Sequence, residues 1–355
     1  MCGGDELIPI LYNKQGTTKL ATLDDCIECY VEEERNGPLE LTMVYPNDET
    51  ALHLLQENII VADVNDTLKN QQFRIYDVVK LMSNELEILA RHISFDLAFD
   101  VIDTISFENQ SCEYALNSIF RASQFCRHYT GHSDIINAQD YSMQRCTCQE
   151  AIYGKKGSII DTYGTGAEIL RDNTDIHILN KRGHDNGVTI EYSKNLTGFE
   201  LEEDTSELVT RIIPYAKYRE QDSSEDITLW VLEGVDSPLI SNYSHPYVQY
   251  IDYSSSFEEG VIPTEEGLIN KATNEFSVNN KDKPKQNFKI EFIPLSKCVG
   301  FEDLEDAISL CDTVTIKDSR FNLDTKAKVI KTTYDVLRDR YESMELGEPR
   351  TSLGD

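Results

Sequence analysis

The histidines of this chain are the first residues to test for metal chemistry. His128 and His132 lie four residues apart, so a helix would place both imidazole rings on one face. The glutamate that follows the first histidine of an H-E-x-x-H zinc motif is absent, and Gly131 disfavours a helix between them. We therefore expect no metallopeptidase site at these histidines.

The cysteines form two short pairs with the spacing of thiol sites. Cys26 and Cys29 make a C-x-x-C sequence, and Cys146 and Cys148 make a C-x-C sequence, among nine cysteines in all. A closed zinc site needs four ligands, whereas these two pairs lie far apart along the chain. An odd number of cysteines without a secretory signal favours reduced thiols. The alternating residues around Cys26 indicate that these thiols pack in a strand.

Carboxylates are so frequent that their pairing carries little information. The chain holds 63 Asp and Glu, so pairs such as Glu202 and Glu203, or Glu258 and Glu259, indicate solvated faces. The segment Gly164–Gly166 lacks the third glycine of a dinucleotide loop. Neither a nucleophile elbow nor a P-loop occurs. The sequence therefore predicts no catalytic, cofactor-binding or metal-binding residues.

One histidine and four tyrosines lie in more ordered surroundings. His92 ends a predicted strand, and we interpret it as a hydrogen-bonded structural histidine. Tyr243, Tyr247, Tyr250 and Tyr253 could form a platform for saccharides, but the sequence favours a role in an interface or a core.

The charge of the chain excludes several classes of partner. Lys and Arg number 33 against 63 Asp and Glu, which gives a net charge of -30 over 355 residues. Such an acidic protein does not bind phosphate backbones or anionic membranes tightly. No run of about 18 apolar residues occurs, and the start of the chain lacks a signal sequence. We expect two to about four soluble domains that fold in the cytoplasm, without a membrane anchor.

Strands dominate the first part of the chain. Residues 23–45 predict a β-hairpin around Asn36-Gly37-Pro38, because apolar residues alternate on both sides of that turn. Residues 58–64, 73–78 and 86–90 predict further strands. Short sequential strands joined by turns are typical of a small barrel or sandwich.

Helical spacing follows in the next part of the chain. Apolar residues of 112–126 recur at helical intervals, and Ser111 is a suitable amino-terminal cap. Residues 148–163 also predict helix, with an interruption at 154–157. Further on, 264–274 predicts a short helix, and 227–232 predicts a strand that holds the only tryptophan, Trp230.

The remaining strands suggest a repeat. Residues 167–170 and 176–179 predict strands, and 183–215 alternates apolar and polar residues in two strands that flank an acidic stretch. Near the end, a strand that closes with Asp318 and a longer one at 327–334 follow the same order as 59–63 and 73–79. We interpret this order as a duplication.

The expected fold class is α+β, mostly β, with two similar small β-barrel domains and two inserted α/β or mixed domains. The first barrel is expected at 1–95 and an inserted α/β domain at 96–165. The second barrel is expected at 166–215 together with 296–347, and an inserted mixed domain at 216–295.

Five short motifs resemble one protein family. They are Q-x-F-R-I-Y (ending at Tyr76), A-x-H-I-x-Y-D-L (90–97, with Phe95 in place of tyrosine), K-N-L (194–196), T-R-x-x-P (210–214) and R-Y-x-x-x-x-L-G (340–347). Their order and spread over the chain are similar to the phage tail hub proteins, the amino-terminal region of tail-associated lysins in the prophage tail endopeptidase family.

The resemblance implies a structural protein of the virion, assembled in the bacterial cytoplasm. Three copies of such a hub form a ring at the distal end of the tail, with two similar barrels each, and join a sixfold tail tube to a threefold tip. Expected partners are the tail tube or distal tail protein and tail-tip or fibre proteins. DNA passes through the channel without specific binding. Longer relatives carry a wall-degrading domain downstream, so no lytic residues are expected in this chain.

Two other classes of function remain open. The chain could be a cell-wall hydrolase, which would turn over peptidoglycan, or a receptor-binding module, which would bind saccharide at the tyrosines of 243–253. For the hub, we expect that acidic residues, including the stretch 200–207, line the channel and repel DNA phosphates within a Debye length of about 8 Å.

Overall fold

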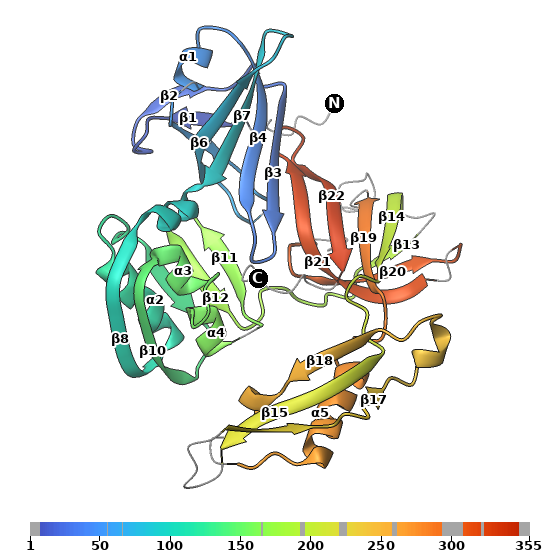
Figure 1. Cartoon of the computed structure of the whole chain (residues 1–355). Coiled ribbons are helices and arrows are strands. Elements are labelled where there is room, and N and C mark those ends of the chain that lie inside the picture. Colours follow the sequence, from blue (N-terminus) through green and yellow to red (C-terminus); the bar gives the residue numbers. More distant parts are fainter. Residues whose placement is uncertain are drawn as a thin grey trace. The chain divides into compact units, whose positions relative to one another are not determined.

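A computed structural model of the chain is shown in Figure 1. The structure describes residues 8–54, 56–65, 67–164, 166–191, 196–219, 226–257, 261–292, 308–320 and 323–347. The chain divides into two compact units, of which unit 1 contains residues 1–200 and 288–355 and unit 2 contains residues 201–287. Strands dominate both units, which confirms the α+β, mostly β fold class.

The first half of the large sheet in unit 1 is built by the amino-terminal strands. They are β1 (Ile10–Tyr12), β2 (Lys19–Thr22), β3 (Glu28–Glu34), β4 (Leu39–Pro46), β5 (Ile59–Ala62), β6 (Gln71–Lys80) and β7 (Glu85–His92), with the short helix α1 (Ala51–Leu54) before β5. The predicted hairpin is confirmed as β3 and β4, which pair antiparallel. Asn36 turns the chain between them with a φ of 55°, a conformation that asparagine tolerates.

The second half of this sheet comes from later parts of the chain. Its strands are β13 (Thr189–Glu191), β14 (Leu196–Asp204), β19 (Lys285–Phe292), β20 (Thr313–Asp318), β21 (Leu323–Asp335) and β22 (Arg340–Gly347). The spatial order β14-β19-β22-β21-β20-β13 repeats the order β3-β4-β7-β6-β5-β1 of the first half. The chain order of the corresponding strands is also the same, so the two halves share one topology.

The repeat extends to the register of the strands. In the first half, the N–H of Ile75 donates to the carbonyl of Asn58 at 3.1 Å, and in the second half Val329 donates to Asp312 at 2.8 Å. A β-bulge follows both Ile75 and Val329 in the pairing with the next strand. The two outer strands differ, because β1 pairs antiparallel with β5 whereas β13 pairs parallel with β20.

The two halves are joined into one sheet and do not form the two closed barrels that the sequence predicts. In the described residues β21 pairs with β20 over 323–328 and with β3 over 331–335, along the same edge. Because β3 pairs with β21, β3 does not pair with another strand of the first half to close a barrel. The sheet therefore stays open, with β14 and β2 at the two ends of its strand order. Tyr334 and Val336 consequently lie in the hydrophobic core of the first half.

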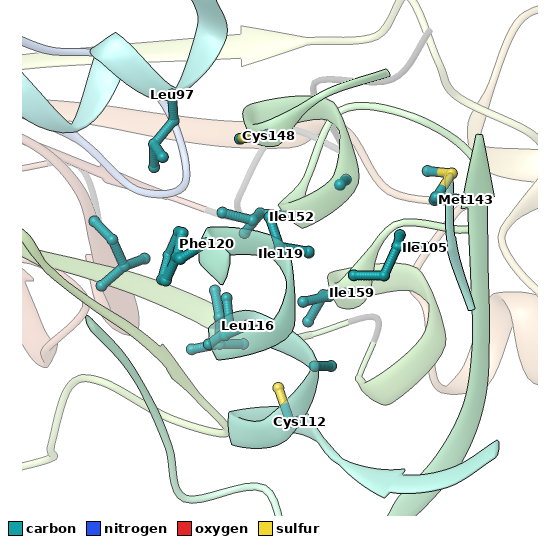
Figure 2. Packing of buried hydrophobic residues seen from close by; sticks show 14 of the residues in the cluster. Leu97, Ile105, Cys112, Leu116, Ile119, Phe120, Met143, Cys148, Ile152 and Ile159 are labelled. Atoms are coloured by element: carbon teal, nitrogen blue, oxygen red, sulfur yellow. The ribbon is translucent and has the colours of Figure 1, made fainter. Parts of the chain in front are cut away.

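Unit 1 also contains an α/β part after β7. Its elements are the 3-10 helix η1 (Ile93–Phe99), β8 (Val101–Ser111), α2 (Cys112–Ala122), β9 (Thr130–Ser133), β10 (Ala138–Thr147), α3 (Cys148–Ile152), α4 (Ile159–Tyr163), β11 (Glu168–Asp172) and β12 (Asp175–Leu179). Figure 2 shows its core, in which Leu116, Ile119 and Phe120 of α2 lie near Ile152 and Ile159. β8 pairs with β10.

The strands β11 and β12 belong to this α/β part, although the sequence places them at the start of the second barrel. β12 pairs with β11 antiparallel and with β9 parallel. Ile169, Ile176 and Ile178 are buried in the same core as α2. The partner of β12 therefore comes from a segment more than forty residues earlier, which local alternation does not reveal.

The helices begin where the sequence predicts. Ser111 caps α2 by accepting the N–H of Tyr114 at 3.2 Å. Thr147 and Glu150 form a capping box at the start of α3, which satisfies two backbone donors that the helix leaves open. The expected interruption at 154–157 separates α3 from α4.

Unit 2 is a four-stranded sheet covered on one face by a helix. Its elements are β15 (Arg211–Arg219), β16 (Asp226–Trp230), β17 (Val235–Asp236), β18 (Val248–Asp252) and α5 (Glu265–Ser277), with the 3-10 turns η2 (Ile240–Asn242) and η3 (Ser254–Ser256). Ile212 and Ala216 of β15 pack in clusters with Ala272 and Leu268 of α5. The helix predicted at 264–274 and the strand predicted at 227–232 are both present. Across the described parts of the chain, no helix is long and apolar enough to span a membrane.

Candidate functional site

The two histidines of the zinc-like pair do not lie on a helix. His132 is on β9, where its ring stacks on that of His177 at 4.6 Å and its Nε2 lies 3.5 Å from Asp175. His128 lies in the turn before β9 and contacts the ring of Tyr129. In the residues that the structure describes, no group of three or more His, Cys, Asp or Glu is placed to hold a metal ion.

The paired cysteines are packing residues. Cys29, Cys146 and Cys148 are buried, and burial raises the pKa of all three thiols, that of Cys148 to about 12. Cys26 is partly exposed and directs its thiol to the carbonyl of Glu28 at 3.3 Å. A raised pKa keeps these three buried thiols protonated, and protonated thiols are poor nucleophiles and poor metal ligands.

The remaining sequence candidates occupy ordinary structural positions. Gly164 ends α4, and Glu202 and Glu203 lie on β14. The pair Glu258 and Glu259 lies outside the described residues.

His92 is a buried structural histidine, as its position at a strand end predicts. Its Nδ1 accepts the N–H of Ser94 at 3.3 Å, and its Nε2 donates to Oε1 of Gln71 at 3.1 Å. Gln71 in turn donates to Asp172 and accepts the N–H of Asn173 in the β11–β12 turn. Burial, and secondarily the charge of Arg171, lowers the pKa of His92 to about 3. The neutral ring thus connects the end of β7 to the α/β part.

The motif around β6 and η1 holds the same region together. Arg74 donates from Nε and Nη2 to the two carboxylate oxygens of Asp96, at 3.0 and 2.8 Å. Its Nη1 also donates to the carbonyl of Lys14. Such a bidentate pair fixes the angle between β6 and η1. The resemblance motifs of this region therefore mark a structural connection.

A buried ion pair connects β3 to the segment that follows β12. Arg182 donates from Nη1 and Nη2 to the carboxylate of Glu33, at 2.6 and 3.0 Å, and also to the carbonyl of Ile169. Glu33 is 1% exposed. The attraction of Glu33, acting against burial, raises the pKa of Arg182. The two hydrogen bonds hold the side chains of Arg182 and Glu33 in place.

A second buried carboxylate joins three parts of unit 1. Glu168 of β11 accepts Nε of Arg35 at 2.7 Å, the N–H of Arg182 at 2.7 Å and Nζ of Lys328 at 2.5 Å. Burial would raise the pKa of Glu168, but these hydrogen bonds outweigh burial and lower the pKa to about 2. Because Arg35 follows β3 and Lys328 lies on β21, one carboxylate connects both halves of the large sheet to the α/β part.

The turn from the α/β part into the second half needs a glycine. A Cβ on Gly183 would lie 2.0 Å from the carbonyl oxygen of Cys311, a distance that no side chain can adopt. The next residue, His184, donates its N–H to the carboxylate of Asp312 and accepts the N–H of Thr313. Together, Arg182, Gly183 and His184 dock this turn between β3 and β20.

Unit 2 presents aromatic residues on the face of its sheet that α5 does not cover. Tyr215 and Trp230 are cross-strand partners, and their rings stack at 4.4 Å. Tyr250 of β18 meets Trp230 edge-on at 5.9 Å and is 63% exposed. Of the other predicted tyrosines, Tyr253 is buried and Tyr243 donates its hydroxyl to the carbonyl of Asp282. The tyrosines thus divide between a core and an open face.

The fold is that of known prophage tail proteins. It is similar to the prophage tail protein gp18 from Listeria monocytogenes (TM-score 0.60, 14% identity, 98% of this chain and 96% of that chain). It is also similar to a tail protein from Neisseria meningitidis (TM-score 0.58, 10% identity, 98% of both chains). A third match is the 43 kDa tail protein of prophage MuSo2 from Shewanella oneidensis (TM-score 0.57, 11% identity, 98% of this chain and 100% of that chain).

Sequence comparison identifies a phage tail protein. The family model described as prophage endopeptidase tail matches residues 184–355 of this chain. A search of curated protein sequences found no match.

The residues that organise unit 1 are not evident from the sequence. Glu33 and Arg182 are separated by 149 positions, and Arg35 and Glu168 by 133. In a chain with 63 acidic residues, no local pattern marks Glu33 and Glu168 as buried. The one usable signal is that arginines are scarce in this chain, so each arginine beside an apolar strand is a candidate for a buried pair.

Proposed function

We propose that this protein is a structural hub of the phage tail tip, in which three copies form a ring around the DNA channel. In this ring, the hub joins the sixfold tail tube to the threefold distal tip. Its partners are the tube or distal tail protein on one side and tip or fibre proteins on the other. The role is structural, and the endopeptidase in the family description is not transferred to this chain.

The observation that carries the proposal is the repeated half of the large sheet. One chain contains the same six-strand order twice, with the same bulge and the same hydrogen bond at its centre. Three chains would therefore present six similar units, which is the number that a sixfold tube requires. The likeness of nearly the whole chain to prophage tail proteins supports a place in the tail.

Electron microscopy and mass measurement test this proposal. We expect particles of three chains in solution or on isolated tails, with an inner contour of six similar lobes and an outer contour of three. A ring with another number of chains would contradict the hub. We further propose that acidic residues of the ring face the DNA, and a basic or neutral inner surface in such a reconstruction would exclude that arrangement.

A second candidate function is favoured by the open aromatic face of unit 2. Tyr215, Trp230 and Tyr250 form a connected aromatic surface, the kind of surface that stacks on sugar rings. Trp230 is the only tryptophan of the chain, so its fluorescence reports on this face alone. Titration with cell-wall saccharides should change this fluorescence if unit 2 binds a receptor. Unchanged emission would leave the aromatic face without a saccharide ligand.

Turnover of peptidoglycan would separate the hub from the hydrolase alternative. We expect purified protein to release no muropeptides, with or without a chelator. Release that stops when the chelator is added would instead indicate a metal-dependent peptidase.

A further inference from the structure

The contact between the two halves of the large sheet is made by one strand edge. Beyond the bulge, β21 pairs antiparallel with β3, from Lys331 opposite Glu34 to Asp335 opposite Tyr30. At its two ends Arg35 donates its N–H to the carbonyl of Ile330, and Val336 donates to the carbonyl of Cys29. Every second residue of β21, from Ile330 to Val336, therefore directs its backbone N–H and C=O groups toward β3.

The matching edge in the first half has no such partner. Because the two halves share one register, residues 76–80 of β6 correspond to residues 330–334 of β21. Among the described residues, residues 76–80 pair only with β7. Tyr76 and Val79 are each more than two-fifths exposed, whereas Ile330 is buried. An uncovered strand edge with apolar side chains is a template for pairing with another strand.

The end of β6 shows the same difference more sharply. Val336, the first residue after the last pair of β21, is 1% exposed and packs in the core of the first half. Its counterpart after β6 is Met82, which is fully exposed, at 107%. Met82 thus extends the run of exposed apolar residues that Tyr76, Val79 and Leu81 form along β6 and its end, and such a contiguous run is typical of an interaction surface.

The repeat also specifies what that partner is. The strand that covers β21 is β3, and the counterpart of β3 in the second half is β14, by its place in the strand order. β14 is the end strand of the large sheet in the part of the chain that the structure describes. Within one chain, β14 and β6 are not neighbours in the sheet. A β14 that pairs with β6 in the way that β3 pairs with β21 therefore comes from a second copy of the chain.

We propose that the β6 edge of one chain, residues 76–80, pairs with β14 of a second copy, and that Met82 packs into the second half of that copy. This contact repeats between chains the contact that β21 and β3 make within a chain. Because it joins two different surfaces, it is heterologous, and copies add head to tail until the ring closes. The inference rests on the proposed hub, for which it defines the contact between subunits.

Two substitutions test the pairing from different directions. Met82→Asp places a charge at an exposed position, so the isolated chain should fold normally while self-association weakens about tenfold or more. Val78→Pro removes an N–H that, by its match to Thr332, points away from β7 toward the open edge. The matched control is Ile136→Asp, since Ile136 is equally exposed, at 97%, in the α/β part. We expect this control to associate like the wild type.

Sedimentation equilibrium of the full chain gives the reading, with circular dichroism to verify folding. The pairing predicts a wild-type trimer that both β6 variants weaken and the control does not. A wild-type chain that stays monomeric overturns the pairing. A trimer that neither Met82→Asp nor Val78→Pro weakens also overturns it but leaves the hub intact, whereas a ring of another number of chains contradicts the hub itself.

Discussion

Arg182 places its two terminal nitrogens 2.6 and 3.0 Å from the two carboxylate oxygens of Glu33, and both side chains are at least nine-tenths buried. The pair connects a strand near the amino terminus to a segment 149 residues later. Since two buried charges cannot lose one partner without leaving the other uncompensated, this contact holds the α/β part to the large sheet.

Breaking this pair should be costly, and removing it whole should cost less. We expect Glu33→Ala to lower the free energy of unfolding of unit 1 by about 3–5 kcal/mol, because the Arg182 charge stays buried. The double variant Glu33→Met, Arg182→Met should be the more stable of the two. Urea unfolding followed by far-ultraviolet circular dichroism measures this, and Trp230 fluorescence provides an internal control in unit 2. Equal loss in the single and double variants would contradict a paired role.

Glu168 should make stability depend on pH in an acidic window. Its pKa in the folded protein, about 2, lies below its ordinary value of 4.5, so the folded state favours the charged form. The resulting stability is fully present above pH 4.5 and is lost as pH falls from 4.5 through 2. The wild type should therefore lose its advantage over Glu168→Gln across this window. The exposed Glu49→Gln, as a control, should follow the wild type throughout.

His92 should not titrate near neutral pH. Burial lowers its pKa from 6.5 to about 3, so protonation opposes the folded state as pH falls below 6.5. In a nuclear magnetic resonance titration we expect its ring signals to stay constant between pH 7.5 and about 5. A transition of the His92 signals near pH 6.5 would contradict the buried, neutral ring.

Gly183 should tolerate no side chain. In Gly183→Ala the new Cβ would meet the backbone of Cys311, which cannot move aside as a flexible side chain could. We expect a loss of about 3 kcal/mol or more in the stability of unit 1. Gly166→Ala is the matched control, because no atom lies within 4 Å of its added Cβ. Similar thermal unfolding of both variants would exclude the close contact.

Local structure could be predicted from the sequence because its causes are local. Ser111 precedes a helix with apolar residues at helical spacing, and α2 begins there. Asn36 lies between two alternating stretches, and the hairpin turns there. The position of His92 at a strand end predicts a hydrogen-bonded structural histidine, and its bonds to Ser94 and Gln71 agree with this prediction.

Pairing between distant strands could not be predicted, since it depends on contacts that no local pattern records. The pairing of β21 with β3 decides that the two halves form one sheet, although each half alone has the pattern of a small barrel. The same limit applies to β12, whose local alternation predicts a strand but not its pairing with β9. In the sequence, the duplication appears only as a short and a longer strand in the same order, and the matching strand register supports it.

Unit 2 occupies a particular place in the repeat. In the first half, β3 and β4 are joined by the short turn at Asn36, whereas most of unit 2, residues 205–284, lies between their counterparts β14 and β19. The position of a short hairpin turn in the first half is thus occupied by a separate compact unit in the second half. The strand order on either side of this position is the same in both halves. The strand order of the second half therefore does not depend on how long the connection between β14 and β19 is.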